Sequence, residues 1–288
     1  MKNRTIKKII SSQKVNMGGI YLQQPLPDRT IDQIDPFILI HHGSFSVKLG
    51  KKQSESGVGP HPHRGFSPVS FVFKGEIQHQ DSLGNNEIVG QGGTQWIHSG
   101  NGIIHSERPS KNMLKNGGGH EFIQFWVNTP AKHKMENPYY LPLSANKTPI
   151  IKKEKAAIQI VAGEFEGVIG PAKTYSPQLL LRFNTKSGAE LNLEIPQNYN
   201  SLIYLLDGEI ESNDQVARGK DMLWFNNDGE QVSLRVTQDS RFILLSGEPI
   251  GESIATYGPF VMNTEQEIRE AIEDYQNGKM GELKETFD

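Results

Sequence analysis

The sequence predicts an all-β protein made of two tandem β-barrels, with one helix near its end. Three observations support this prediction. Glycine and proline, 29 and 16 residues of 288, recur so often that they leave runs too short for most helices. The runs between them are rich in β-branched, aromatic and aliphatic residues, which favour strands. A weak internal repeat then indicates that one barrel fold occurs twice.

The candidate strands are short, apolar and bounded by turn residues, a pattern typical of barrels and sandwiches. They lie at residues 69–73, 95–98, 122–127, 179–183, 202–206 and 242–245.

The internal repeat sets the expected domain boundaries. Residues 71–77 (FVFKGEI) match residues 204–210 (YLLDGEI), and residues 89–92 have a counterpart at 216–219. A polar stretch containing several lysines, residues 144–155, separates the two copies and is typical of a linker. We therefore expect an N-terminal barrel over residues 1–143, a linker over 144–155 and a C-terminal barrel with the terminal helix over 156–288.

The predicted helix begins at a capping box formed by Thr264 and Glu267. Apolar residues then recur at helical spacing, and Gly278 can end the helix. These residues are Ile268, Ala271, Ile272 and Tyr275. A single apolar stripe of this kind predicts packing against a barrel rather than catalysis.

Composition excludes several classes of function. With 30 basic and 33 acidic residues and a net charge of -3, the chain has no basic face for direct nucleic-acid binding. The absence of cysteine excludes disulfides and thiolate metal ligands, so redox chemistry would need a metal or cofactor. No window approaches the roughly 20 apolar residues of a membrane span. The N-terminal segment does not resemble a signal peptide, and we expect a cytoplasmic protein.

Two short motifs predict a metal site. His61 and His63 lie two residues apart, so on a strand both side chains point to the same face. His105 and Glu107 repeat this spacing 44 residues downstream. A single pair is more often a surface or hydrogen-bonded feature, but two pairs inside one barrel would present three imidazoles and a carboxylate to a divalent ion.

These motifs resemble those of the pirin family. Residues 59–66 (GPHPHRGF) and 95–109 (QWIHSGNGIIHSERP) are similar to the two pirin metal-binding motifs, and further similarity covers nearly the whole chain. It includes residues 35–39 (DPFIL), 124–128 (QFWVN), 247–249 (GEP) and 257–264 (YGPFVMNT).

The resemblance implies a bicupin, two cupin-type β-barrels in tandem, whose N-terminal barrel holds one ion. The implied ligands are His61, His63, His105 and Glu107, and the implied ion is Fe(II). The same ligands also suit Mn, Co, Ni, Cu and Zn.

The second barrel of this family generally holds no metal. The repeat agrees, because its register sets Val232 opposite His105 and Leu234 opposite Glu107. One departure from the family concerns Ser67, where pirins commonly carry a glutamate. Its loss leaves the four ligands in place but puts the tuning of the metal site in doubt.

The other histidines have no paired context and are interpreted as ordinary residues. They are His41, His42, His79, His98, His120 and His133. His98 is interpreted as facing solvent, with a place beside the metal ligands as the alternative.

The resemblance implies two alternative functions. Bacterial pirin-like proteins are associated with quercetin 2,3-dioxygenase activity, in which a small aromatic flavonol coordinates the metal and dioxygen opens its heterocycle. Glu107 would then be the base that removes the flavonol proton. Eukaryotic pirins are described instead as co-regulators in the nucleus, in which the iron state changes the surface offered to a protein partner. The chain has no basic nuclear-localisation run, which makes this redox-sensing role the weaker expectation.

Overall fold

The computed structural model describes residues 1–287, and it divides the chain into two compact units. The unit that carries the predicted metal ligands contains residues 42–146 and the chain from residue 251 onward. We call it the histidine unit. The other contains residues 1–41 and 147–250, and we call it the apolar unit because an apolar cluster fills its barrel.

Two large β-sheets form the histidine unit, with strand orders β5-β10-β7-β8 and β12-β9-β6-β11, the second continuing to β4, and β23 and β24 form a small third sheet. The strands are β4 (Phe37–Ser46), which begins in the apolar unit, β5 (Val58–His63), β6 (Phe66–Lys74), β7 (Glu76–Asp81), β8 (Asn86–Gly90), β9 (Thr94–His98), β10 (Ile103–Pro109), β11 (Gly119–Asn128), β12 (Tyr139–Leu143), β23 (Ala255–Tyr257) and β24 (Phe260–Met262).

The two sheets of the histidine unit face each other. Gln95 on β9 and Gln124 on β11 both donate hydrogen bonds to Glu107 on β10, which belongs to the opposite sheet. Because side chains alternate along a strand, these contacts identify the inward face of each strand. The polar residues of the barrel interior therefore lie next to the predicted metal ligands.

The main sheet of the apolar unit is antiparallel, of order β1-β21-β19-β22-β17-β14-β13, to which β18 and β20 add. Outside this sheet, β2 pairs with β3, and β15 pairs with β16. Its strands are β1 (Ile6–Ser11), β2 (Gln13–Met17), β3 (Ile20–Leu26), β13 (Ile150–Lys153), β14 (Ala156–Ala162), β15 (Glu164–Phe165), β16 (Val168–Ile169), β17 (Gln178–Thr185), β18 (Glu190–Glu194), β19 (Asn200–Ser212), β20 (Gln215–Arg218), β21 (Asp221–Phe225) and β22 (Gln231–Gly247).

Apolar side chains from most of these strands pack into one cluster. Val232 and Leu234, which the repeat aligns with His105 and Glu107, are both buried in it. Hydrophobic burial therefore stabilises this unit at the positions where the histidine unit carries polar residues.

The predicted fold class is confirmed. All six predicted strand segments lie within observed strands, namely β6, β9, β11, β17, β19 and β22. Gly75 and Gly208, which the repeat aligns, have φ angles of +76° and +86°. At both positions a Cβ atom would lie within 3 Å of neighbouring atoms, so the repeated glycine reflects a shared turn.

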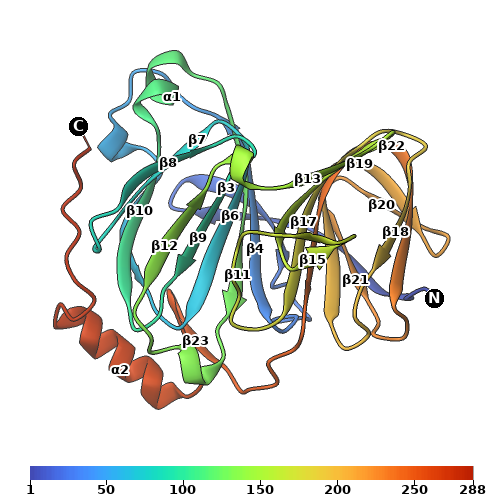
Figure 1. Cartoon of the computed structure of the whole chain (residues 1–288). Coiled ribbons are helices and arrows are strands. Elements are labelled where there is room, and N and C mark those ends of the chain that lie inside the picture. The colour runs from blue at the N-terminus through green and yellow to red at the C-terminus, as the bar shows by residue number, and fades with distance from the viewer. Residues whose placement is uncertain (288) are drawn as a thin grey trace. The chain divides into compact units, whose positions relative to one another are not determined.

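The structure divides the chain differently from the three consecutive segments expected. The N-terminal strand β1 pairs with β21 of the apolar unit, and the C-terminal helix belongs to the histidine unit. Figure 1 shows this helix in red next to the histidine unit strands. The pairing of β1 with β21 joins residues more than 200 positions apart, and position along the chain does not reveal it. The expected linker contains the boundary at residue 147, but part of it forms β13.

Two α-helices occur among the described residues, α1 (Lys111–Asn116) and α2 (Glu265–Gln276). Thr264 and Glu267 form the predicted capping box at the start of α2. Ile268 and Ala271 are buried with Phe260 and Met262 of β24, so the apolar stripe packs as predicted. Neither helix is long and apolar enough to cross a membrane.

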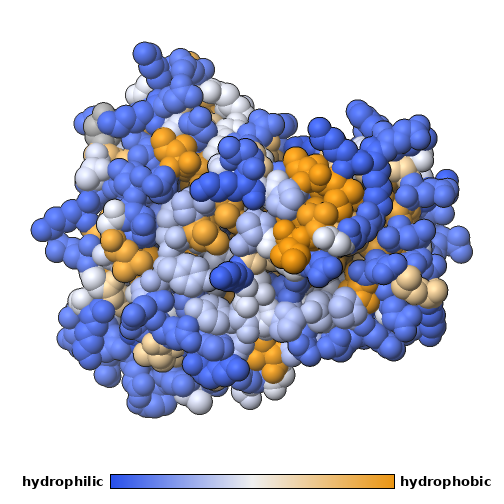
Figure 2. Space-filling model, viewed as in Figure 1, coloured by the Kyte–Doolittle hydropathy of each residue, from blue (hydrophilic) through white to orange (hydrophobic). Residues whose placement is uncertain are grey.

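The face shown in Figure 2 is largely hydrophilic, with an apolar patch over the place that β13 and β15 occupy in Figure 1. In the apolar unit, Ile150 of β13 and Ile169 of β16 are exposed. β13 is the last strand in its sheet order. The exposed apolar surface therefore lies at a sheet edge.

Candidate metal centre

Two antiparallel strands position three of the predicted ligands. His61 and His63 lie on β5, and His105 lies on β10 directly opposite His61. The period of two along β5 turns both of its histidines toward the barrel interior. Strand register alone therefore brings residues 44 positions apart in the chain onto one inward face.

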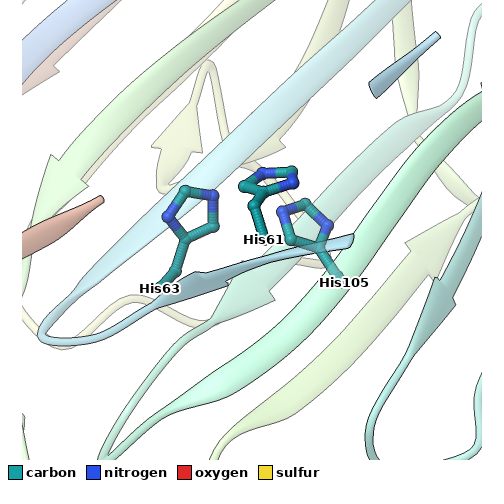
Figure 3. A group of neighbouring side chains, drawn as sticks. All are labelled: His61, His63 and His105. Carbon is teal, nitrogen blue, oxygen red and sulfur yellow. The ribbon is translucent and has the colours of Figure 1, made fainter. Parts of the chain in front are cut away.

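The three imidazole rings converge, as Figure 3 shows. One ligand nitrogen from each ring lies within 4.8 Å of the others. The ring centroids are 4.3 to 4.9 Å apart. Divalent ions bind histidine nitrogen at about 2.0–2.1 Å, so the nitrogens around one ion lie roughly 3 to 4 Å apart. The triad is close to the spacing that one ion needs.

Hydrogen bonds to backbone carbonyls fix the tautomer of two of the imidazoles, so that each can bind a metal. His61 Nδ1 donates to Gly59 O at 2.8 Å, and His63 Nδ1 donates to Pro259 O at 3.3 Å. Each bond places the proton on Nδ1 and leaves the Nε2 lone pair free to bind a metal. The arrangement resembles the outer-shell support found around many metal-bound histidines.

The third imidazole also fits a ligand role. His105 is fully buried, and neither of its ring nitrogens has a hydrogen-bond partner among residues 1–287. A buried polar atom without a partner costs free energy, and coordination of an ion would satisfy it. Burial lowers the pKa of His63 and of His105 well below the ordinary value, and the neighbouring histidines add to this effect. Both rings are therefore neutral near pH 7, as coordination requires.

Glu107 lies two residues after His105 on β10, but its carboxylate is not part of the nitrogen cluster. Its Oε1 accepts a hydrogen bond from Gln95 Nε2, and its Oε2 accepts one from Gln124 Nε2 at 2.9 Å. The pairing between β10 and β5 shifts register between His105 and Glu107. Its role as a fourth ligand stays a prediction.

The C-terminal tail supports β10 from its outer side. Arg108 donates two hydrogen bonds to Glu285, at 2.7 and 2.8 Å. Thr286 and Gln80 exchange two more, at 2.8 and 2.9 Å. Burial raises the pKa of Glu285, but the hydrogen bonds from Arg108 and Ser106 and the charge of Arg108 outweigh it and leave that pKa below its usual value. Segments far apart in sequence thus hold the strand that carries His105 and Glu107.

Ser67 does not face the triad. It pairs with Val127 on β11, so it lies on the opposite sheet face from Gln124 and Trp126. Trp126 lies on the inward side, with its ring centroid 5.6 Å from that of His63. The glutamate that pirins commonly carry at this position would, on this backbone, also point away from the three histidines.

The interpretation of His98 as solvent-facing is wrong. His98 is fully buried, and burial lowers its pKa to about 4. It lies three residues after Gln95 on β9, and therefore on the opposite face from the barrel interior. Its ring lies against Tyr139, with centroids 5.2 Å apart. His98 is thus a core residue rather than a neighbour of the predicted metal ligands.

Sequence reasoning missed His79, which it interpreted as ordinary. His79 on β7 pairs with Glu107, and its ring centroid is 5.4 Å from that of His105. It is fully buried and bonded to Asp81 at 2.8 Å. The spacing of His79 and Asp81 is the same period of two that marked the metal ligands, so this signal was present in the sequence. No comparable signal marks Gln95 and Gln124, which bond to Glu107, or Tyr140, whose ring is stacked on that of His79.

We expect each chain to bind one metal ion tightly. The histidine triad is the one cluster of three or more candidate ligands found among the described residues. The aligned positions of the apolar unit, Val232 and Leu234, have no ligand atoms. Elemental analysis of protein purified without a metal-chelating tag checks this number. Two tightly held equivalents would show that the alignment of the two halves is incorrect.

Comparison with known proteins agrees with the motifs. Residues 19–127 match the family model described as Pirin, and residues 180–281 match the Pirin C-terminal cupin domain. A Pseudomonas aeruginosa protein provisionally named a quercetin 2,3-dioxygenase is 35% identical over 248 residues, covering 85% of this chain and 86% of that protein. The Arabidopsis thaliana pirin-like protein 2 is 34% identical, with 96% and 85% covered.

A solved structure is also similar over nearly its whole length. The crystal structure of quercetin 2,3-dioxygenase from Acinetobacter baumannii superposes with a TM-score of 0.92 at 32% identity. The alignment covers 98% of this chain and 100% of that one. This solved structure therefore shares the two-barrel architecture of the chain.

Proposed function

The chain belongs to the pirin family, and from this premise we propose that it is a metal-dependent dioxygenase acting on a flavonol-type substrate. The observation that carries the proposal is the convergence of three imidazole nitrogens beside a carboxylate on the same strand. The relatives named for quercetin 2,3-dioxygenase activity support it. The substrate class is therefore a small aromatic molecule with hydroxyl groups.

The proposed metal ligands are His61, His63, His105 and Glu107, and the proposed ion is Fe(II). Mn, Co, Ni, Cu and Zn are alternatives, because imidazole and carboxylate ligands suit all of them. When bound, the ion supplies a Lewis acid for a substrate hydroxyl and the redox chemistry with dioxygen. Three imidazoles and one carboxylate leave coordination positions open for these molecules.

Glu107 is the proposed base. The amides of Gln95 and Gln124 orient its two oxygens, and a carboxylate oxygen can accept more than one hydrogen bond. A substrate hydroxyl next to it would transfer its proton to the carboxylate. The two amide bonds hold Glu107 in place for this transfer.

Aromatic side chains next to His63 fit a planar substrate. The rings of Phe66 and Trp126 have centroids 4.3 Å apart, and both contact the ring of His63. Such rings stack on aromatic molecules and limit the access of water to the reacting atoms. The aromatic surface formed by Phe66 and Trp126 favours an aromatic substrate over a small aliphatic one.

Oxygen uptake tests the proposed function. Protein replete with Fe(II) is expected to consume dioxygen when quercetin is added, and to consume none without it. Protein stripped of metal by a chelator is the matched control and should consume no dioxygen. Reloading the same protein with Fe(II) should restore the uptake. Absence of uptake with every flavonol tested would contradict the proposal. It would favour the alternative, an iron-dependent redox-sensing regulator that binds a partner protein.

A further inference from the structure

A buried histidine–aspartate pair lies beside the metal triad on the neighbouring strand. On β7, Asp81 pairs with His105 and His79 pairs with Glu107, so both side chains share the inward face with the proposed ligands. His79 and Asp81 are 0% and 3% exposed. Their atoms Nε2 and Oδ2 are 2.8 Å apart.

The surroundings of Asp81 settle which nitrogen of His79 carries the proton. Asp81 accepts three hydrogen bonds from donors other than His79, two from the backbone N–H groups of Leu83 and Asn85 and one from the Asn85 side-chain amide. The carboxylate is therefore ionised and can only accept hydrogen bonds. Consequently His79 Nε2 carries the proton and donates it, and in the neutral ring Nδ1 presents a lone pair.

This lone pair is a buried acceptor without a donor. His79 Nδ1 has no hydrogen-bond partner among residues 1–287. The ring cannot turn freely to find one, because it is stacked on Tyr140 with centroids 3.8 Å apart and planes 8° apart. A buried acceptor left unpaired is costly, so a donor that reaches it gains free energy.

We infer that His79 Nδ1 accepts a hydrogen bond from a hydroxyl of the molecule bound at the triad, and so orients that molecule. The inference rests on the site of the proposed function. It narrows the substrate class to molecules with two neighbouring oxygens, such as a catechol or a hydroxyketone, at least one of them a hydroxyl. One oxygen reaches the triad, and the hydroxyl reaches His79, whose ring centre is 5.4 Å from that of His105.

The hydrogen bonds of Asp81 provide a sharp variant. Its Oδ1 accepts from the backbone N–H groups of Leu83 and Asn85, at 2.9 and 3.1 Å. In Asp81→Asn the amide oxygen must keep this place, so the amide N–H₂ group faces His79 Nε2. The Asn85 side chain, which donates to Oδ2 at 2.8 Å, then has to turn its amide over and accept. Nε2 then has to accept, and the proton moves to Nδ1. This variant turns the proposed acceptor into a donor with almost no change of shape.

The probe is 4-nitrocatechol, titrated into protein loaded with Zn²⁺ so that no turnover occurs. His79→Phe keeps an aromatic ring for stacking on Tyr140 but removes the acceptor. We expect His79→Phe to weaken binding of the probe by roughly ten-fold, the effect of one lost hydrogen bond. Asp81→Asn should weaken it by a smaller factor, because the hydroxyl must then accept from Nδ1–H instead of donating. Zinc stoichiometry should stay at the wild-type value, and 4-nitrophenol, which has one hydroxyl, should bind all these proteins alike.

The matched control is His120→Phe. His120 is also a buried histidine whose ring nitrogens lack partners among the described residues, but its ring contacts Phe45 and Phe122 rather than the triad. This variant should bind 4-nitrocatechol as the wild type does. Thermal unfolding of each variant shows whether it folds. If His79→Phe does not fold, the affinity of Asp81→Asn for 4-nitrocatechol provides the test.

Three results would overturn the inference. They are unchanged 4-nitrocatechol affinity in a folded variant, loss of zinc together with the probe, and failure of wild-type zinc protein to bind the probe. Loss of zinc would make His79 a metal ligand instead. The titration needs no oxygen. An absence of flavonol turnover would therefore contradict the proposed dioxygenase function without changing the measured binding of 4-nitrocatechol.

Discussion

Replacing His105 with alanine is expected to abolish tight metal binding. His105 supplies one of three converging nitrogens and is fully buried, so no solvent-exposed side chain can take its place. Loss of an outer-shell partner typically lowers metal affinity by 10- to 100-fold. Loss of a ligand should therefore cost at least about 100-fold. Competition with a chromogenic chelator measures this affinity.

His120→Ala is the matched control for this prediction. It also removes a buried imidazole from the histidine unit, and burial lowers the pKa of His120 to about 4. It should keep the wild-type metal affinity, because His120 is outside the triad. Equal loss of metal in both variants would point to damaged folding. Full retention of metal by folded His105→Ala would refute the site.

Replacing Glu107 with glutamine is expected to reduce flavonol turnover far more than it reduces metal content. An amide can stay near the ion, but it cannot accept the substrate proton. Loss of a general base typically lowers the rate by 10²- to 10⁴-fold. Turnover and bound metal must be measured on the same samples. Equal and modest losses of both would leave Glu107 a ligand role only.

The neighbours of Glu107 predict how the glutamine variant adapts. The new amide would place an N–H₂ group against Gln95 or Gln124, both of which donate to the carboxylate. Gln95 also accepts a hydrogen bond from the Tyr140 hydroxyl, whereas the second partner of Gln124 is the Ser70 hydroxyl, which can either accept or donate. Gln124 is therefore the side chain that can turn over. Glu107→Asp is the useful companion variant, because it keeps a carboxylate. It should retain more turnover than Glu107→Gln.

The strands of both barrels could be predicted because their signals are local. Short apolar runs between glycines mark β6 and β19, and the turn glycines Gly75 and Gly208 recur in both copies. The capping box at Thr264 likewise depends on residues within one helical turn. Membership of a unit is not local. β1 pairs with β21, more than 200 residues away, and the cluster that buries α2 includes Ile104, more than 150 residues away. No pattern within β1 or α2 indicates these distant partners.

The sequence by itself determined that His61, His63 and His105 are candidate ligands, because a period of two on a strand follows from backbone geometry. Only the tertiary structure decided what surrounds them. The pairing of β10 with β7 places His79 and Asp81 beside the triad, and the facing sheet brings Gln95 and Gln124 to Glu107. These neighbours come from different strands, so strand register and sheet packing fix their distances. Alternation along a single strand carries no information about that register.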